Sequence, residues 1–144
     1  TVGPLDANQP KYNMLDRDIE DEVLPFCREQ HIAVLSYSSL ALGLLTGKIT
    51  PERTFPVGDL RAGNPRFTPE SLAKINGMLA QFAPLREKYG LDQTQLSIAW
   101  TISRPGVTCA LVGVRNAQQA AGIAPGGVTI PADDLAEMDR MLVG

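Results

Sequence analysis

Residues 32–48 read IAVLSYSSLALGLLTGK, and this stretch decides the fold. Its first part, Ile32 to Tyr37, is short and almost continuously apolar, which predicts a parallel strand buried on both faces rather than a surface helix. Its second part, Ser38 to Lys48, contains two glycines. Glycines let a backbone approach a ligand closely, and successive N–H groups can hold a pyrophosphate. An ordinary strand-to-helix turn with a core tyrosine explains the same residues, so this stretch alone leaves both interpretations open.

A second turn of the same kind follows the expected strand at 107–112. There Gly113 and Arg115 precede Asn116, which predicts a helix cap. A phosphate in this turn would meet N–H groups at the positive end of the helix, and Arg115 could pair with it through two hydrogen bonds. A solvated arginine beside a capping asparagine is the alternative. Because α/β proteins bind ligands at the carboxyl ends of their strands, the two turns together favour a dinucleotide.

Strands and helices alternate along the chain. Extended segments are expected at residues 5–9, 32–37 and 107–112, and helices at 18–30, 68–82, 92–103, 116–124 and 132–142. A long loop is expected at 38–68, and Pro84 should kink or end the helix before it. This alternation predicts an α/β fold with a parallel sheet, and we expect residues 1–144 to form one segment without an internal domain boundary.

The composition excludes several classes of protein. The net charge is −3, and the lysines and arginines are scattered, so a nucleic-acid partner is not expected. No apolar run approaches the roughly 18 residues of a membrane span, and the first residues carry no secretion signal, so neither membrane insertion nor export is expected and the expected compartment is the cytoplasm. Cys27 and Cys109 lie far apart without metal-site spacing, which predicts reduced thiols.

Several stretches in combination resemble the aldo-keto reductase family, especially its branch related to potassium-channel β-subunits and Tas-like reductases. They are YNMLDRDIEDEVLPFCREQHIAVLSYSSLALGLLTGKI at 12–49, PRF at 65–67, QLSIAW at 95–100, RPGV at 104–107 and VGVRNAQQA at 112–120. The resemblance covers nearly the whole chain. It implies a C-terminal half-barrel: a partial (β/α)8 TIM barrel comprising the last three parallel strands and their helices.

The resemblance also implies an NADP(H) site at the carboxyl ends of these strands. Gln9 would hydrogen-bond the nicotinamide carboxamide, and Tyr37 would stack on the nicotinamide ring. The residues expected to line the pyrophosphate are Ser38, Leu40, Gly43 and Lys48, and those expected around the 2′-phosphate and adenosine are Gly113, Arg115 and Gln119. Arg66 is a further candidate, in the loop that closes over the cofactor in related proteins. The choice of NADP over NAD rests on Arg115 and the family likeness.

The chain departs from the family at four of the matching positions. The Glu-Asn pair that contacts adenine in the family is replaced here by Gly122 and Ile123, which cannot make those hydrogen bonds. Ser39 stands where a proline is common, and Leu42 stands where an arginine or a small residue precedes the glycine. The full set of adenine contacts is therefore not expected.

Neither a catalytic residue nor a metal ligand is expected in this chain. The family's catalytic Asp, Tyr, Lys and His lie on strands upstream of the first residue here. His31 is the one histidine and has no partner motif, and no tyrosine has the Asp and Lys that would make it an acid.

The expected function is the NADP(H)-binding part of an aldo-keto reductase-type oxidoreductase, which is inactive alone. The alternatives are a non-catalytic half-barrel module that binds nucleotide or self-associates, and a truncation product without a function of its own. The expected partners are the dinucleotide and either a second copy or a complementary N-terminal half-barrel, because the inner face of the sheet should be apolar.

Overall fold

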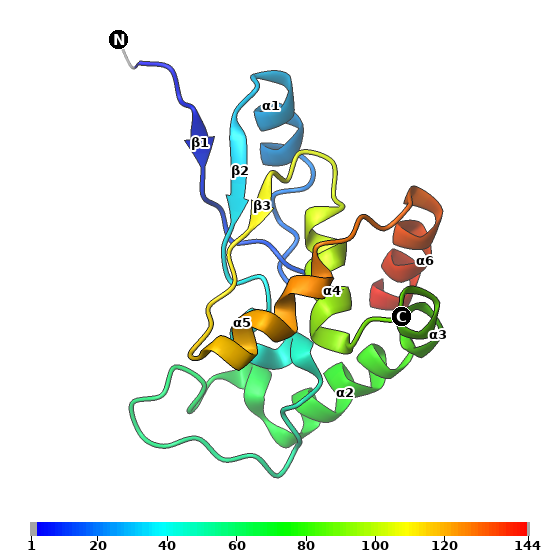
Figure 1. Ribbon diagram of the computed structural model, residues 1–144. Coiled ribbons are helices and arrows are strands. Elements are labelled where there is room, and N and C mark those ends of the chain that lie inside the picture. Colours follow the sequence, from blue (N-terminus) through cyan, green and yellow to red (C-terminus); the bar gives the residue numbers. More distant parts are fainter. Residues whose placement is uncertain (1–2, 144) are drawn as a thin grey trace.

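The fold is a parallel α/β arrangement built on a short sheet. The computed structural model describes residues 3–143, and within that range three strands form one sheet in the order β1-β2-β3. Strand β1 (Ala7–Asn8) pairs with β2 (Ala33–Ser36), and β2 pairs with β3 (Cys109–Ala110), both in parallel. Figure 1 shows the strands side by side, with the helices gathered on one side of them and below. The predicted α/β class and parallel sheet are confirmed, although each strand is shorter than expected.

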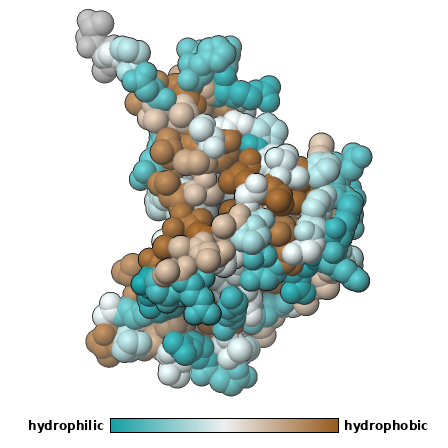
Figure 2. All heavy atoms as spheres, in the orientation of Figure 1, coloured by the Kyte–Doolittle hydropathy of each residue, from teal (hydrophilic) through white to brown (hydrophobic). Residues whose placement is uncertain are grey.

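The two faces of the sheet differ in how they are covered. Val34 and Ser36 are fully buried on the face where α1 packs on β2. Ala33 and Leu35 alternate with them, point to the opposite face and are only half-buried. Large apolar side chains next to the strands are also exposed: Leu5, shortly before β1, by 58%, Tyr37, just after β2, by 45%, and Leu111, just after β3, by 38%. Figure 2 shows apolar surface along this part of the molecule. The expectation of strands buried on both faces is therefore wrong for this chain, because its helices cover one face only.

Helix α1 (Val23–Glu29) begins later than expected. Residues 18–22 form turns instead of the first helical turn predicted from Asp18. The Glu20 N–H donates to the Arg17 carbonyl at 3.1 Å, and the Glu20 carboxylate accepts from Arg17 and Arg104. The Arg104 contact comes from 84 positions away and helps to hold the segment in turns, so the local helical spacing does not decide its conformation.

The long loop expected at 38–68 contains two short 3₁₀ helices. They are η1 (Ala41–Thr46) and η2 (Pro65–Phe67). Helix η1 is interrupted by left-handed residues at Leu42 and Gly43, and η2 is only three residues long, so neither is long or regular enough to show helical periodicity in the sequence. The segment 50–64 between them consists of turns and irregular backbone.

Helices α2 (Pro69–Ala80) and α4 (Gln93–Ile102) follow the predicted boundaries closely, whereas α3 (Ala83–Tyr89) was not predicted from the sequence. The predicted break before Pro84 is confirmed, and Pro84 lies in the first turn of α3, where its missing N–H leaves no helical bond unmade. Asp92 and Gln95 form a capping box at the start of α4, with each side chain accepting from the other's backbone N–H.

The last part of the chain contains α5 (Ala117–Ile123), η3 (Ala124–Gly126) and α6 (Ala132–Val143). Asn116 caps α5 as predicted, by accepting from the Gln119 N–H at 2.8 Å. A Cβ at Gly126 would lie 2.8 Å from the Gln95 carbonyl oxygen, so the close approach of η3 to α4 requires glycine there.

A charged cluster surrounds the largest core side chain. Trp100 is fully buried and stacks on Tyr12 at 5.5 Å between ring centroids. The Arg17 and Arg104 guanidinium groups lie 5.3 and 4.9 Å from the Trp100 centroid, and both pair with Asp139, at 2.9 and 2.7 Å. We call Arg17, Glu20, Arg104 and Asp139 the clasp, because they join the N-terminal segment, the end of α4 and α6.

Two further predictions concern the cysteines and the membrane. Both cysteines are free thiols, with Cys27 buried and Cys109 half-buried. Within the described range, 3–143, every helix is too short or too polar to cross a bilayer.

Candidate functional site

The turn that follows β2 has an unusual backbone. Ser38, Ala41 and Leu42 have positive φ angles of 59°, 48° and 57°, and Gly43 has 97°. Non-glycine residues rarely adopt this left-handed region, and each one costs about 1–3 kcal/mol unless its surroundings hold it. Such residues concentrate at ligand sites. The Ala41 N–H closes the turn by donating to the Ser38 carbonyl at 2.8 Å.

The turn that follows β3 lies against the first turn. The Leu111 N–H donates to the Ser36 carbonyl at 2.8 Å, and the buried Ser39 hydroxyl donates to the Leu111 carbonyl at 3.1 Å. The Arg115 N–H donates to the Gln119 side-chain oxygen at 2.8 Å. The two glycine-containing turns predicted from the sequence are therefore neighbours, joined through Ser39.

A cavity of about 740 Å³ lies between these turns, α5 and the long loop. Its size falls within the range of about 300–1,000 Å³ typical of ligand pockets. Seven of the nine residues predicted to bind the cofactor line it, namely Ser38, Leu40, Gly43, Lys48, Gly113, Arg115 and Gln119. The structure thus brings together residues from two separate strand ends around one space.

Gln9 and Tyr37, the other two predicted residues, lie outside this cavity. Gln9 is exposed just after β1, and Tyr37 is exposed just after β2. The Tyr37 N–H donates to the Pro10 carbonyl at 3.0 Å, and the Tyr12 N–H donates to the Tyr37 carbonyl at 3.2 Å. The two residues therefore follow the ends of adjacent strands, beside the cavity.

Arg66, the additional candidate, also lies outside the cavity. Its guanidinium group forms two hydrogen bonds to the Asp16 carboxylate, at 2.8 and 2.9 Å. Lys11 pairs with the same carboxylate at 2.8 Å. Burial alone would raise the pKa of Asp16, but hydrogen bonds from Arg66, Lys11 and Asn13 lower it to about 2. Arg66 thus anchors the loop to the segment 11–16.

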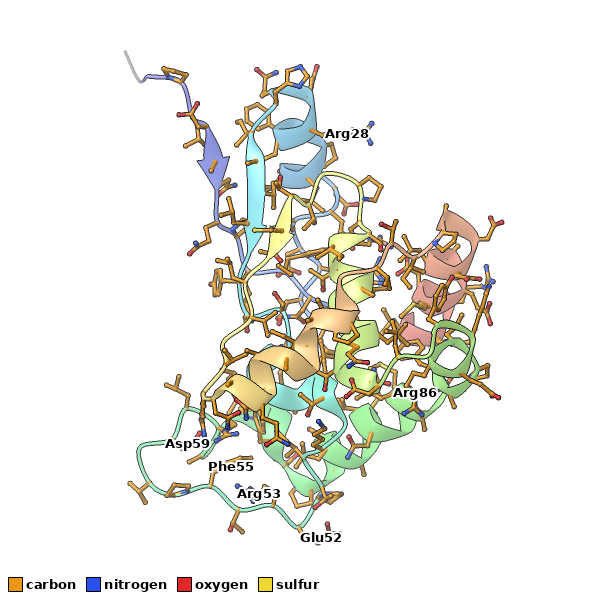
Figure 3. The ribbon with its side chains drawn as sticks, viewed as in Figure 1. Arg28, Glu52, Arg53, Phe55, Asp59 and Arg86 are labelled. Atoms are coloured by element: carbon orange, nitrogen blue, oxygen red, sulfur yellow. The ribbon has the colours of Figure 1, made fainter. Side chains whose placement is uncertain are left out.

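Arg61 is the loop arginine that lines the cavity, and the sequence did not single it out. It donates from Nε and Nη2 to the two Asp59 oxygens at 2.8 and 2.6 Å, and its guanidinium group lies 4.4 Å from the Phe55 ring centroid. Hydrogen bonds from Arg61 are the main cause that lowers the pKa of Asp59, and the charge of Arg115 contributes. Figure 3 shows Phe55 and Asp59 on the loop that runs past the start of α5.

Thr94 and Asp92 line the cavity from the start of α4. Thr94 is 7% exposed, and its hydroxyl oxygen has no hydrogen-bond partner among the described residues. A buried hydroxyl without a partner is uncommon in folded proteins. Only the helix cap could be read from the sequence here, because the contact with the cavity depends on the packing of α4 against η1.

Comparisons with known proteins identify the family. The model of the Aldo/keto reductase family matches residues 2–142. The chain belongs to the aldo/keto reductase family. Aldo-keto reductase YhdN of Bacillus subtilis is 34% identical over 143 residues, which cover 98% of this chain and 43% of YhdN. The NADH-specific methylglyoxal reductase of Escherichia coli is 39% identical over 117 residues, 81% of this chain and 35% of that protein.

A solved structure of another aldo/keto reductase has the same fold. The glycerol dehydrogenase AKR11B4 from Gluconobacter oxydans superposes with a TM-score of 0.90 at 32% identity, over 99% of this chain and 43% of that one. The aldo/keto reductase chain described here therefore spans less than half the length of the relatives it matches.

The described part of this aldo/keto reductase contains no histidine or tyrosine within the cavity lining. His31 lies in an exposed turn after α1. Burial and a hydrogen bond to Glu20 raise the pKa of Tyr12, and burial and Asp134 raise that of Tyr89 to about 12. Both phenols therefore stay protonated, and each donates a hydrogen bond to a carboxylate that lies away from the cavity.

Proposed function

We propose that this aldo/keto reductase chain binds a nicotinamide dinucleotide across the turns that follow β2 and β3. The observation that carries the proposal is the cavity, which gathers Lys48, Arg115 and the left-handed turn at Ser38 around one space. Among the described residues, neither Lys48 nor Arg115 makes an ion pair. Two cations without protein partners beside a glycine-containing turn suit an anionic ligand.

The residues of the cavity fit such a ligand. Gly43 has a φ of 97°, and a Cβ there would lie 3.3 Å from the Ile49 side chain, so this conformation of the turn favours glycine, which leaves the backbone N–H groups accessible to a ligand. In this proposal Ser38, Leu40, Gly43 and Lys48 hold the pyrophosphate. Gly113, Arg115 and Gln119 surround the 2′-phosphate and adenosine.

The nicotinamide would lie beyond the cavity, over the strand ends. Tyr37 would stack on its ring, and Gln9 would hydrogen-bond its carboxamide. Both side chains are exposed and follow adjacent strands, which leaves them free to make these contacts. A dinucleotide would then extend from α5 to the end of β1.

We favour NADP(H) over NAD(H) because Arg115 is available to a 2′-phosphate. Two features weaken that preference. Asp59 places a negative charge near Arg115, and Gly122 and Ile123 in the cavity lining offer no side-chain hydrogen bonds to adenine. One relative is named as NADH-specific, so both cofactors must be measured.

The reaction we propose for the longer protein is hydride transfer between the nicotinamide and an aldehyde or ketone carbonyl. In that proposal residues 1–144 form one C-terminal half-barrel segment of a (β/α)8 barrel. The alkoxide would develop beside the nicotinamide, where Tyr37 is assigned to stacking and not to proton donation, so we expect the chain alone to bind the cofactor without turnover.

A self-associating module is the second candidate. The observation that favours it is the half-exposed apolar face of the sheet, with Leu5, Tyr37 and Leu111 at its strand ends. Exposed apolar faces of this kind mark association surfaces. A second copy or a complementary N-terminal half-barrel would cover it, and a monomeric sedimentation profile at tens of micromolar would count against self-association.

Titration of the purified chain with NADPH and NADH, followed by nicotinamide fluorescence, tests the proposed function. Carbonyl-dependent oxidation of NADPH is measured in parallel. We expect saturable binding without turnover. Turnover would reveal a catalytic acid that the described residues do not supply, and no binding at millimolar dinucleotide would overturn the proposal.

A further inference from the structure

The side chain of Asn13 is fully buried and uses its whole hydrogen-bonding capacity. Its Oδ1 accepts from the N–H groups of Leu15 and Asp16 at 2.8 and 3.1 Å. Its Nδ2 donates to the Asp16 carboxylate and to the Ser38 carbonyl, both at 3.0 Å. An asparagine can accept two hydrogen bonds and donate two, so each of its four sites has a protein partner.

The bond to Ser38 crosses from the segment after β1 to the turn after β2. The Ser38 carbonyl accepts from Asn13 on one side and from the Ala41 N–H, at 2.8 Å, on the other. Ser38 is also the first residue of this turn with a positive φ. Because a serine does not hold the left-handed conformation unaided, outside contacts must maintain it. Asn13 is the side chain that supplies one.

Asp16 fixes Asn13 in turn. It receives an Asn13 Nδ2 hydrogen and is held by Lys11 at 2.8 Å and by Arg66 at 2.8 Å. Arg66 belongs to η2, at the far end of the long loop. The carboxamide of Asn13 is therefore hydrogen-bonded to a carboxylate that Lys11 and Arg66 hold in place. This arrangement keeps the Asn13 side chain oriented toward Ser38.

We propose that Asn13 is a positioning residue for the dinucleotide site, which it serves by holding the left-handed Ser38 turn in its binding conformation. Asn13 does not line the cavity, so it acts through Ser38 and not on the ligand. The inference rests on the proposed function, since the site it positions is the dinucleotide cavity.

Two substitutions separate the bond to Ser38 from the rest of the network. Asn13→Ala removes all four hydrogen bonds. Asn13→Ser keeps a hydroxyl that can accept from the neighbouring N–H groups but is too short to reach the Ser38 carbonyl. Both should weaken NADPH binding about tenfold, because the Ser38 carbonyl loses a donor and the turn relaxes.

The matched control is Thr101→Val. Thr101 is fully buried in α4, donates to the Ser97 carbonyl at 3.0 Å and lies outside the cavity lining. Its replacement by valine removes one buried side-chain donor to a backbone carbonyl, as the Asn13 variants do at Ser38. We expect lower stability in urea with unchanged NADPH affinity.

Hydrogen exchange at the Ala41 amide reports on the stability of the Ser38 turn and can be measured without any ligand. In both Asn13 variants this amide should exchange faster, while the Leu96 amide in α4, which donates to the Asp92 carbonyl, should be affected only as global stability is. Unchanged Ala41 exchange, or faster exchange with undiminished NADPH affinity, would overturn the positioning role. If the unsubstituted chain bound neither NADPH nor NADH, the proposed function would fail, and exchange at Ala41 alone would then decide whether Asn13 holds the turn.

Discussion

The clasp and the cavity both carry arginines, but the arginines are used differently. In the clasp, Arg17 and Arg104 are paired with carboxylates and lie over the Trp100 ring. In the cavity, Arg61 is likewise paired, with Asp59, but Arg115 is exposed and makes no ion pair with a described residue. Paired charges in a half-buried cluster stabilise the fold, whereas a cation left without a partner remains available to a ligand. Substitutions in the two regions should therefore separate stability from binding.

The largest effect is expected from Arg104→Ala in the clasp. Asp139 and Glu20 each lose one of their two arginine partners, because only Arg17 remains, and a cation is removed from the Trp100 face. We expect a loss of about 2–3 kcal/mol in the free energy of unfolding, measured in urea, because the cluster is half-buried rather than fully buried. An unchanged urea midpoint would show that the clasp charges do not stabilise the fold.

Arg115→Ala should give the opposite result. The free energy of unfolding should stay within about 0.5 kcal/mol, as for other exposed side chains. NADPH affinity should fall about tenfold because a charge-assisted contact to phosphate is lost. Arg53→Ala is the matched control, since Arg53 is an exposed arginine of the long loop, labelled in Figure 3, and does not line the cavity. Equal weakening in both variants would indicate a general charge effect instead of a specific site.

Acid should weaken the fold through Asp16. Its pKa is lowered in the folded state from 3.8 to about 2, so the stability it contributes is complete above the unfolded pKa and is lost as the pH falls from about 4 to 2. The partly exposed carboxylate limits this to about 1 kcal/mol. Urea midpoints measured against pH should show the loss, and Asp16→Asn should flatten this part of the profile. A profile with the same slope in Asp16→Asn would place the acid sensitivity elsewhere, for example at Asp139, whose pKa is also lowered, by Arg104 and Arg17 against the effect of burial.

The smallest effect should come from Asp59→Asn. This change removes the negative charge that lowers the positive potential around Arg115 and Arg61. The ratio of NADH to NADPH dissociation constants should rise about twofold, because only NADPH carries the 2′-phosphate and exposed charges interact weakly. Glu52→Gln, an exposed acidic residue of the same loop, serves as the control and should leave the ratio unchanged. A ratio that falls in Asp59→Asn would mean that the 2′-phosphate is not near Arg115.

The features predicted from the sequence depend on neighbours along the chain. The caps at Thr68, Asp92 and Asn116 involve residues three positions apart, and each stands at the residue where the sequence predicts that a helix begins. The position of the central strand follows from its continuous apolar run. Local signals were sufficient for these elements because the interactions that form them are local.

The features that the sequence missed depend on contacts between distant residues. Arg61 and Arg66 occur in the same loop, but only Arg61 lines the cavity. Arg66 is held outside the cavity by its ion pair with Asp16, 50 positions away, and the sequence does not reveal this contact. The bond from Asn13 to Ser38 and the late start of α1 have the same origin. The sequence shows which segments contain such residues, but their contacts depend on how distant segments pack together.

The clasp also sets when this chain can finish folding. Arg17 and Asp139 are 122 positions apart, and the parallel strands β2 and β3 also pair segments far apart in the sequence, as in Leu35 with Cys109. Contacts of this kind are formed late and slowly, because a long loop must close before they stabilise anything. During synthesis on the ribosome the segment that contains Arg17 would stay without its Asp139 partner until α6 had been made, so the charged cluster around Trp100 would be completed only after α6.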